Sequence, residues 1–442
     1  MTVLRVLVCV CFVAVLSFAA GGADGALQFH WRGHTSNPNL AKDLAPTWEG
    51  VFKAILQSIE DDEFRKDVQE KIADGVRREK TSEVISYCDL SIVECNKYDI
   101  VKMTLRGMEG GKLNLAYLPD TLQSLEVSDS TLAQEFRVEN LSPNLETIVF
   151  SNVSFASPAA VIAPTSAALK KLVCKKCGLG MVTFGDGNGL NILDLSYNDF
   201  TTVPSSLPAT VMSLSLKGCK LAGPLEKLLG ALPTNVQSID VGYTHLTDIL
   251  EGIKGVPHHV QHIDISGNPI NTDVSLLLDA LRPSSGFLQG ILVKGCGLSG
   301  RLQRFQNMVA LRTLDVSHNS LSSVRWAELP PRLEVLALSH NVFGGVLLVR
   351  NLPPSLKVLD VSHNKLEGRL NVADVPPNLE TLDVSYNGFS GAIDLTQLPD
   401  SIRYVYVQFN RFQGTPNLVE IPVDLRRILI HDNDWDSLLP PL

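Results

Sequence analysis

The side chains in this chain that could support chemistry are cysteines, histidines and aromatic residues at regular distances. The pair in Cys174-Lys-Lys-Cys177 has the spacing of a zinc or redox motif. No second cysteine pair in the sequence stands at metal-site spacing, so packed thiols are the preferred interpretation. The run Asp186-Gly-Asn188-Gly begins like a calcium loop, but its sixth and twelfth positions lack the required glycine and glutamate, which favours a turn.

Three histidines, His318, His340 and His363, occupy the same place in consecutive segments, and Tyr386 and Phe409 continue the series. Imidazoles on neighbouring strands could approach one metal ion, but no fixed carboxylate is evident to complete the ligand shell. Simple copying of the block Ser-His-Asn is the alternative. The sequence contains no nucleophile elbow, phosphate-binding glycine loop or His-Glu-x-x-His motif, so we expect no catalytic residue, no metal and no cofactor.

These residues belong to a repeat. Segments 311–321 and 356–366 share the template L-x-x-L-x-L-x-x-N-x-L, which recurs about every 23 residues, within the range of leucine-rich repeats. Fifteen units begin at Ile100, Leu122, Leu145, Leu169, Leu190, Val211, Val236, Val260, Leu288, Leu311, Leu333, Leu356, Leu379, Ile402 and Leu425.

The register of the template predicts how each unit folds. Apolar positions 4 and 6 alternate with polar ones, as in a half-buried strand, and stacked units must share one core. Position 9, usually asparagine, is expected to satisfy backbone groups inside the bend, and Cys177, Cys219 and Cys296 share its column. We therefore predict an α/β solenoid, a leucine-rich repeat horseshoe of about 15 repeats with a parallel concave sheet and a helical N-terminal cap. The return legs are expected to be extended or 3₁₀, with a short helix within 274–281.

The repeat and the segments before it divide the chain into three predicted parts. Residues 1–26 carry Arg5, an apolar stretch too short to span a bilayer and small residues after it, which predicts a signal peptide; a buried strand or an uncleaved anchor is the alternative. Residues 27–99 have apolar residues at helical spacing and predict the cap, and residues 100–442 form the solenoid.

Two cysteines, Cys88 and Cys95, stand just before the first repeat. A solenoid needs its end covered, and a disulfide between these two residues would close a short capping loop. Two free thiols are the alternative.

Composition and charge narrow the partners. The 442 residues are 45% hydrophobic with a formal net charge of -9, which excludes a disordered chain and argues against nucleic acid as a partner. No second stretch approaches the roughly 20 apolar residues of a transmembrane segment, and no glycolipid anchor signal is evident. In an exported chain the sequons at Asn140 and Asn152 are expected glycan acceptors.

Ligand contacts are expected on the concave strand face, at positions 3, 5, 7 and 8 of each unit. The candidate ligand-binding residues are Tyr386, Tyr404, Tyr406, Phe409, His318, His340 and His363. Position 5 carries Asp194, Asp240, Asp264, Asp315, Asp360 and Asp383. A basic patch of Lys171, Lys175, Lys176 and Lys217 indicates either a solvated face or a site for an anionic glycan.

The pattern Leu-Pro-Pro-x-Leu-x-x-Leu-Asp-Val-Ser-x-Asn-x-Phe/Leu-x-Gly, at 352–368 and 375–391, resembles the repeats of kinetoplastid surface proteins such as promastigote surface antigen and proteophosphoglycan-related proteins. The spacing of Cys88 and Cys95 resembles the N-terminal caps of plant receptor ectodomains and polygalacturonase inhibitors. These resemblances imply secretion or surface display, and recognition of protein or glycan partners without catalysis.

The sequence therefore predicts a non-catalytic exported protein, secreted or at the cell surface, that binds a protein or glycan through its concave face. A structural or antigenic coat protein without a defined ligand is the alternative. The identity of the ligand and the oligomeric state stay open.

Overall fold

The computed structural model describes residues 93–96, 99–113, 115, 118, 120–139, 141–163, 168–185, 189–247 and 257–436. The predicted signal peptide, almost all of the predicted cap, the Cys88–Cys95 pairing, Asn140 and the loop at 186–188 lie outside these residues. The chain divides into two compact units. We call Met1–Asp199 with Pro204–Thr210 the N-terminal unit, and Phe200–Val203 with Val211–Leu442 the C-terminal unit.

The described part of the N-terminal unit is built on parallel strands. β2 (Asp99–Arg106), β4 (Ser124–Leu132), β6 (Thr147–Phe155), β8 (Lys171–Lys175) and β10 (Ile192–Asp194) pair in that order. Before them, β1 (Val93–Asn96) pairs antiparallel with β2. The described end of the predicted cap is thus a strand that extends the sheet, and the segments with helical spacing lie outside the described residues.

The N-terminal unit has further short strands. β3 (Glu109–Gly111) pairs with the end of β4. β5 (Phe136–Val138), β7 (Ala159–Ile162) and β9 (Met181–Phe184) form a second parallel sheet on the return legs.

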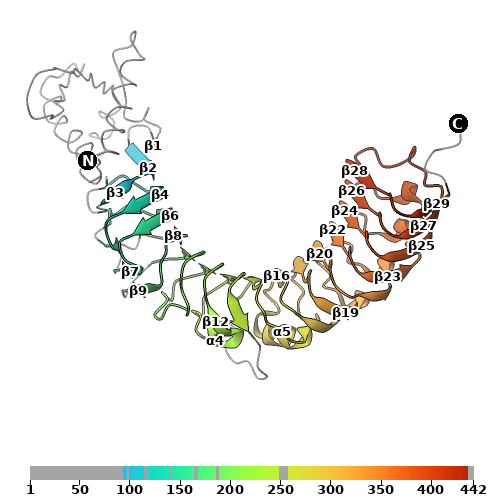
Figure 1. Ribbon diagram of the computed structural model, residues 1–442, viewed down its shortest axis with the longest axis horizontal. Coiled ribbons are helices and arrows are strands. Elements are labelled where there is room, and N and C mark those ends of the chain that lie inside the picture. The colour runs from blue at the N-terminus through green and yellow to red at the C-terminus, as the bar shows by residue number, and fades with distance from the viewer. Residues whose placement is uncertain are drawn as a thin grey trace, which may run out of the picture. The chain divides into compact units, whose positions relative to one another are not determined.

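The C-terminal unit continues the same pattern with ten parallel strands of three residues each (Figure 1). They are β11 (Ser213–Ser215), β13 (Ser238–Asp240), β15 (His262–Asp264), β16 (Gly290–Leu292), β18 (Thr313–Asp315), β20 (Val335–Ala337), β22 (Val358–Asp360), β24 (Thr381–Asp383), β26 (Tyr404–Tyr406) and β28 (Arg427–Leu429). Position 4 of each unit pairs with position 4 of the next, as Leu359 does with Leu382. In the described residues each of the fifteen predicted units contributes one strand to the main parallel sheet, so the predicted register is confirmed.

The return legs of the C-terminal unit lie on its outer side (Figure 1). The predicted helix is present as α5 (Val274–Ala280). A second helix, α4 (Leu225–Gly230), was not predicted from the sequence. The 3₁₀ helices are η3 (Arg282–Ser284), η4 (Trp326–Glu328), η5 (Val349–Asn351), η6 (Val372–Asp374) and η7 (Leu395–Gln397). The short outer strands are β12 (Ala222–Pro224), β14 (His245–Thr247), β17 (Ser299–Leu302), β19 (Ser320–Val324), β21 (Gly344–Val346), β23 (Lys365–Gly368), β25 (Gly388–Ala392), β27 (Arg411–Gly414) and β29 (Asp434–Trp435).

The core lies between the strand face and the return legs. Leu359 and Val361, at positions 4 and 6, have no exposed surface, and Phe389 and Phe412, at position 11, are equally buried with their rings stacked 6.2 Å apart. Each unit therefore contributes one layer of apolar side chains to a core that neighbouring units share.

The asparagine column closes the bend of each unit. Asn319 Oδ1 accepts hydrogen bonds from the backbone N–H groups of Cys296 and Leu298 in the preceding unit, at 3.0 and 2.9 Å. Its Nδ2 donates to the carbonyl oxygens of Val293 and Val316, both at 2.9 Å. The predicted role of position 9 is confirmed, because this buried amide satisfies four backbone groups that the turn leaves without partners.

Cysteine can stand in for part of this role. The Cys296 thiol contacts the carbonyl oxygen of Ile265 in the preceding unit, at 3.3 Å, where asparagine would donate with its amide. Cys174, Cys177, Cys219 and Cys296 are buried free thiols, and burial raises the pKa of Cys296 to about 11. Packed thiols, the preferred interpretation of the Cys174 and Cys177 pair, agree with this structure.

Candidate functional site

The candidate site begins with an unusual backbone conformation at position 8. His318, His340, His363, Tyr386 and Phe409 all have a left-handed backbone, with φ between 50° and 56°. Non-glycine residues seldom adopt this left-handed region, and in bulky residues it strains the backbone. Hydrogen bonds hold the conformation: the N–H groups of His318 and His340 donate to the carbonyl oxygens of Ser339 and Ser362 in the following unit, at 2.8 and 3.1 Å.

Because these five residues share one backbone conformation, their side chains project in the same direction and the five rings stack on one another. We call His318, His340, His363, Tyr386 and Phe409 the ring ladder. Successive ring centroids lie 4.2, 4.0, 3.9 and 4.2 Å apart, with interplanar angles between 11° and 17°. His431 meets the last ring, Phe409, edge to face at 5.2 Å. The three inner rings have both faces covered, so the ladder presents ring edges to solvent.

The ladder is partly accessible, and two of its histidines bind protons weakly. Tyr386 and Phe409 expose 39% and 38% of their surface. Burial lowers the pKa values of His318 and His363 below 6.5, and the neighbouring His340 ring lowers both further. The ladder therefore offers imidazole nitrogens, a phenol group and an apolar ring edge.

The stacked geometry does not gather the histidines around an ion, because the rings lie face to face. In the described part of the chain, no group of three or more histidine, cysteine, aspartate or glutamate side chains converges to hold a metal.

The expectation that position 7 is exposed holds for Lys175 and Lys294 but is wrong for the serines. Ser317, Ser362 and Ser385 are buried. Their hydroxyl groups donate to the Oδ1 atoms of Asp315, Asp360 and Asp383, at 2.6 to 2.7 Å. The aspartates at position 5 are half-buried for the same reason, since each one accepts both the hydroxyl and the backbone N–H of its serine.

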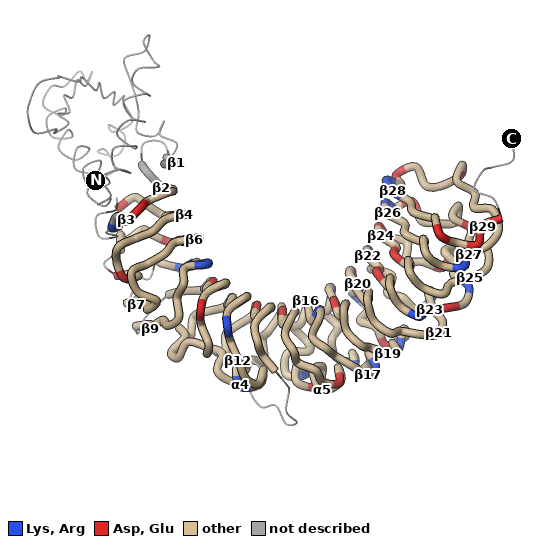
Figure 2. Tube along the Cα trace, in the orientation of Figure 1, with Lys and Arg blue, Asp and Glu red and all other residues tan. Residues whose placement is uncertain are grey.

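The last full strands carry the remaining predicted aromatics. Tyr404 and Tyr406 lie on β26 and are half-buried, so both face the same side of the strand. Tyr406 pairs across the sheet with Asp383 on β24, and the Arg427 guanidinium carbon lies 5.9 Å from the centroid of its ring. Figure 2 shows basic residues at β28. The core needs neither tyrosine, because Val405 and Val407 fill it.

The lysines of the predicted basic patch belong to two different units. Lys171, Lys175 and Lys176 belong to the N-terminal unit, where the Lys175 ammonium group lies 5.2 Å from the Tyr197 ring centroid. Lys217 belongs to the C-terminal unit and forms ion pairs with Asp240 and Asp264, which neutralise it.

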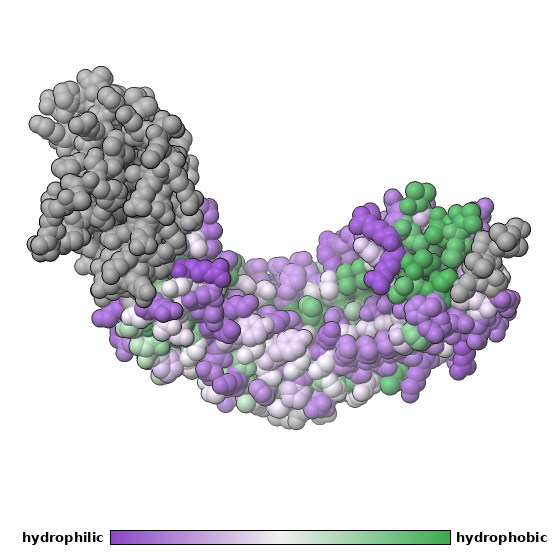
Figure 3. Space-filling model, turned by 45° about the horizontal axis from the view of Figure 1, so that its top comes forward, coloured by the Kyte–Doolittle hydropathy of each residue, from purple (hydrophilic) through white to green (hydrophobic). Residues whose placement is uncertain are grey.

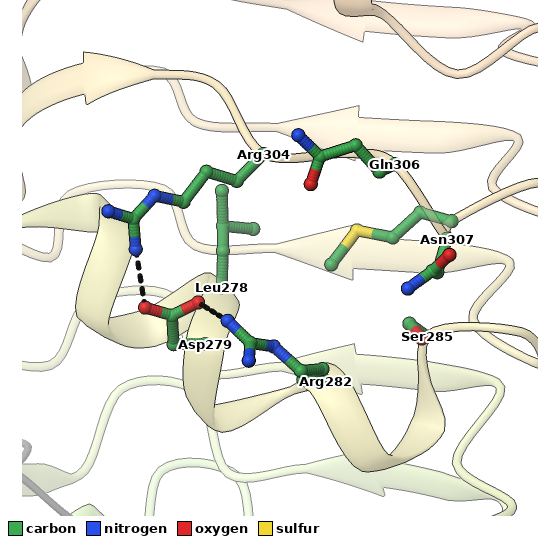
Figure 4. Close-up of a pocket in the computed structure, with 8 residues that line it drawn as sticks. Leu278, Asp279, Arg282, Ser285, Arg304, Gln306 and Asn307 are labelled. Carbon is green, nitrogen blue, oxygen red and sulfur yellow. Dashed lines mark hydrogen bonds and ion pairs between the residues drawn. The ribbon is translucent and has the colours of Figure 1, made fainter.

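A polar pocket of about 370 Å³ opens on the outer side, between α5 and segment 304–308 (Figure 4). Arg304 and Arg282 approach the Asp279 carboxylate from two sides, and the Arg304 bond measures 2.6 Å. Two guanidinium groups share one carboxylate, so the lining keeps a net positive charge, held in ion pairs with Asp279.

Of the two predicted glycan acceptors, the structure describes Asn152. Its side chain is exposed, and its Nδ2 donates to Asp129 Oδ1 at 2.9 Å. Both residues take the left-handed conformation at position 8 of their units.

The sequence reading missed that position 8 is left-handed throughout and that its rings stack. A signal was present: the same column holds Gly107, Asp129, Asn152, Gly218, Gly267 and Gly295. These residue types tolerate positive φ, so their recurrence predicts a left-handed turn in which aromatic residues must project outward.

Comparisons with known proteins agree with this architecture. Two family models, each described as a leucine-rich repeat, match residues 378–404 and 353–369. A leucine-rich repeat protein of Leptospira interrogans superimposes with a TM-score of 0.56 at 17% sequence identity, covering 83% of this chain and 94% of that one. A TDR receptor superimposes with a TM-score of 0.52 at 21% identity, covering 76% of this chain and 64% of that one.

The fold is therefore a leucine-rich repeat solenoid, as predicted. The chain spans less than two thirds of the TDR receptor chain that it resembles. A comparison with curated proteins gives no match. Among the described residues, no helix is long and apolar enough to cross a bilayer.

Proposed function

We propose that this protein is a non-catalytic recognition module that binds a protein partner through the strand face of its C-terminal unit. The observation that carries the proposal is the ring ladder together with Tyr404 and Tyr406. These side chains form an ordered and partly exposed aromatic surface that the core does not need. Surfaces of this kind supply the anchors of protein interfaces.

The ladder favours a protein over a glycan. Sugar rings stack on the open faces of aromatic side chains, whereas the inner rings of this ladder cover one another at about 4 Å. The exposed edges offer hydrogen-bonding nitrogens and a hydroxyl group, and these suit the backbone and polar side chains of a polypeptide. A glycan is the second candidate, at the two end rings, each of which has a ladder neighbour on one face alone.

Export belongs to the same proposal. Secretion or surface display follows from the predicted signal peptide at 1–26, with a disulfide between Cys88 and Cys95 in the cap at 27–99, ahead of the solenoid at 100–442, and glycans on Asn140 and Asn152. The kinetoplastid-type repeat pattern supports this setting, and the receptor among the similar structures is compatible with it. A coat protein without a ligand is the rival function.

A photo-crosslinking experiment tests the proposal. The full chain carrying p-benzoylphenylalanine in place of Phe409 is incubated with an extract and medium of the source cells, and crosslinked proteins are identified by mass spectrometry. The control carries the same group in place of Val346, which is exposed on the outer strand β21. We expect one partner that crosslinks from the strand face and not from the control position.

The partner is then bound to purified variants. Tyr404→Ala, Tyr406→Ala and Phe409→Ala combined should cost at least about 2 kcal/mol of binding free energy. Phe287→Ala, which removes an exposed ring near α5, should leave the affinity unchanged. Equal binding by the triple variant and the parent would exclude the strand face as the site.

A further inference from the structure

On the strand face of the C-terminal unit, two aspartates bind the ammonium group of one lysine. Asp240 and Asp264 stand at position 5 on the adjacent strands β13 and β15, and their backbones are direct neighbours. The Lys217 ammonium group lies 3.6 Å from Asp240 Oδ2 and 3.5 Å from Asp264 Oδ2. It also lies 5.5 Å from the Tyr243 ring centroid. Two aspartates on neighbouring strands therefore form a clamp for one ammonium group.

The same arrangement of carboxylates recurs on β22 and β24. Asp360 and Asp383 stand at position 5 of their units and are direct backbone neighbours. In the described part of the chain, no lysine or arginine lies within ion-pair distance of either carboxylate. Burial raises the pKa of Asp383, the hydrogen bonds from Ser385 lower it, and the nearby Asp360 raises it. The two carboxyl groups are thus held half-buried side by side.

The backbone register shows why the second pair lacks a lysine. The N–H of Leu216 donates to the Asp240 carbonyl oxygen at 2.8 Å, and the N–H of Leu338 donates to the Asp360 carbonyl oxygen at 2.7 Å. Lys217 follows Leu216 directly, whereas Ser339, a short and buried side chain, follows Leu338. A short serine side chain therefore stands at Asp360 and Asp383 where Lys217 stands at the first pair.

The residues beside the second pair indicate how a bound segment would run across the strands. The ring ladder runs alongside it through His363 and Tyr386, and Tyr406 follows on the next strand. Arg427, exposed on β28, has no carboxylate within ion-pair distance among the described residues. Two strand spacings, about 10 Å, separate β24 from β28. An extended segment of about four or five residues covers this span.

We propose that Asp360 and Asp383 bind a cationic side chain of the protein partner, in an extended segment that crosses the ring ladder and places an acidic group at Arg427. The inference rests on the proposed function and specifies the partner's chemistry. The carboxylates clamp the partner's ammonium group as Asp240 and Asp264 clamp Lys217. The covered faces of His363 exclude the additional ring contact that Lys217 makes with Tyr243, so the two carboxylates supply the attraction.

The test uses the full chain and a defined probe, the acetylated and amidated peptide lysine-threonine-tyrosine-threonine-glutamate. A second peptide carries norleucine in place of lysine, which keeps the length and removes the charge. Affinities are measured by calorimetry at low salt, and the aspartate carboxyl carbons are followed by NMR. We expect the lysine peptide to bind about tenfold more tightly than the norleucine peptide, equivalent to about 1.4 kcal/mol.

Three variants locate the effect. Asp360→Asn with Asp383→Asn keeps the oxygens that accept from Ser362 and Ser385 and removes both charges, so the preference for lysine should disappear. Ser339→Lys places a lysine where Lys217 stands in the other clamp. The new ammonium group should pair with Asp360 and Asp383 and so block binding of the probe. Asp315→Asn removes a position-5 carboxylate that has no aspartate neighbour at position 5, and it should leave binding unchanged.

Equal affinity for the two peptides, or a preference that survives in the double variant, would overturn the inference. Failure of the lysine peptide to bind or to shift the Asp360 and Asp383 resonances at millimolar concentration would overturn it as well. The proposed function has its own readout, since a crosslinked partner that depends on Phe409 but not on Asp360 and Asp383 would support the strand face and reject the cation clamp.

Discussion

At the residue scale, one buried amide per unit organises the turn. The carboxamide of Asn319 meets two N–H groups and two carbonyl groups at 2.9 to 3.0 Å. Leaving buried backbone groups without partners costs more than any one of these bonds contributes when it is made. The asparagine column is therefore the feature at which single substitutions should damage the fold most, although it lies close beneath the candidate site.

The variant Asn319→Ala should lower the free energy of unfolding by about 2–4 kcal/mol, because four backbone groups lose a partner. Asn319→Cys should cost less, since Cys296 shows that a thiol in this column contacts the carbonyl oxygen of the preceding unit. Urea denaturation followed by circular dichroism compares the variants. Equal losses for alanine and cysteine would show that the thiol contributes nothing.

The histidines of the ring ladder make stability depend on pH. The pKa values of His318 and His363 are lowered by burial and then by the adjacent His340 ring. The folded state therefore binds protons more weakly than the unfolded state, and the free energy of unfolding should fall as the pH drops from about 6.5 through the lowered values. Any binding that uses these rings should change in the same acidic range.

Denaturation at pH 7.5 and pH 5.5 measures this effect. His318→Phe with His363→Phe keeps aromatic rings in the ladder and removes two titrating groups, so its stability should fall less between the two pH values. NMR titration of the ring protons should give midpoints below 6.5 for both histidines. Midpoints above 6.5 would contradict the lowered pKa values of His318 and His363.

At the scale of elements, the outer legs adapt to the number of residues that each unit provides. The unit that begins at Val260 is long enough for the helix α5, whereas the shorter units that follow use the 3₁₀ helices η4 to η7. Asp273 begins α5, and its side chain accepts the N–H of Ser275 at 2.8 Å. Capping of this kind stabilises the first turn of a helix.

Asp273→Ala should lower the free energy of unfolding by about 1 kcal/mol, because the first turn of α5 loses its cap. Asp273→Asn is the matched control and should retain most of the stability, since its amide oxygen can accept the same N–H. Thermal denaturation of the two variants against the parent decides between them. An alanine variant as stable as the asparagine variant would show that packing of Leu277 and Leu278 alone holds the helix.

At the scale of the whole molecule, the shared core weakens where the described units end. Positions 4 and 6 of the last unit, Ile428 and Ile430, are only half-buried, whereas Leu359 and Val361 are fully buried. Val419 and Val423 are exposed by 77% and 102%, and Figure 3 shows a hydrophobic surface at this end. A unit with one neighbour has half of the stabilising interface of an inner unit.

Hydrogen exchange should therefore reveal a gradient within the C-terminal unit. The amides of β26 and β28 should exchange faster than those of β20 and β22, because the end unit opens without disturbing two neighbours. Mass spectrometry of the exchanging full chain measures the gradient by peptide. Equal protection of β22 and β28 would show that something covers this end in solution.

The sequence by itself determined the repeat, its register and the inward residues. A strand has a side-chain period of two, so the alternation at Leu359 and Val361 fixes which face is buried. The asparagine and cysteine column follows from the same count. The helix α4 was not predicted, because it has six residues and Pro224 before it offers no side-chain cap.

The tertiary structure alone decided how the surface residues meet. The left-handed backbone at position 8 sends the rings of five units into one stack, and only the parallel register brings His363 within 3.9 Å of Tyr386. The burial of the serines at position 7 and the pairing of Lys217 with two aspartates likewise depend on contacts between units. So does the absence, among the described residues, of a lysine or arginine beside Asp360 and Asp383. Sequence patterns describe one unit at a time, whereas these contacts arise from the stacking of neighbouring units.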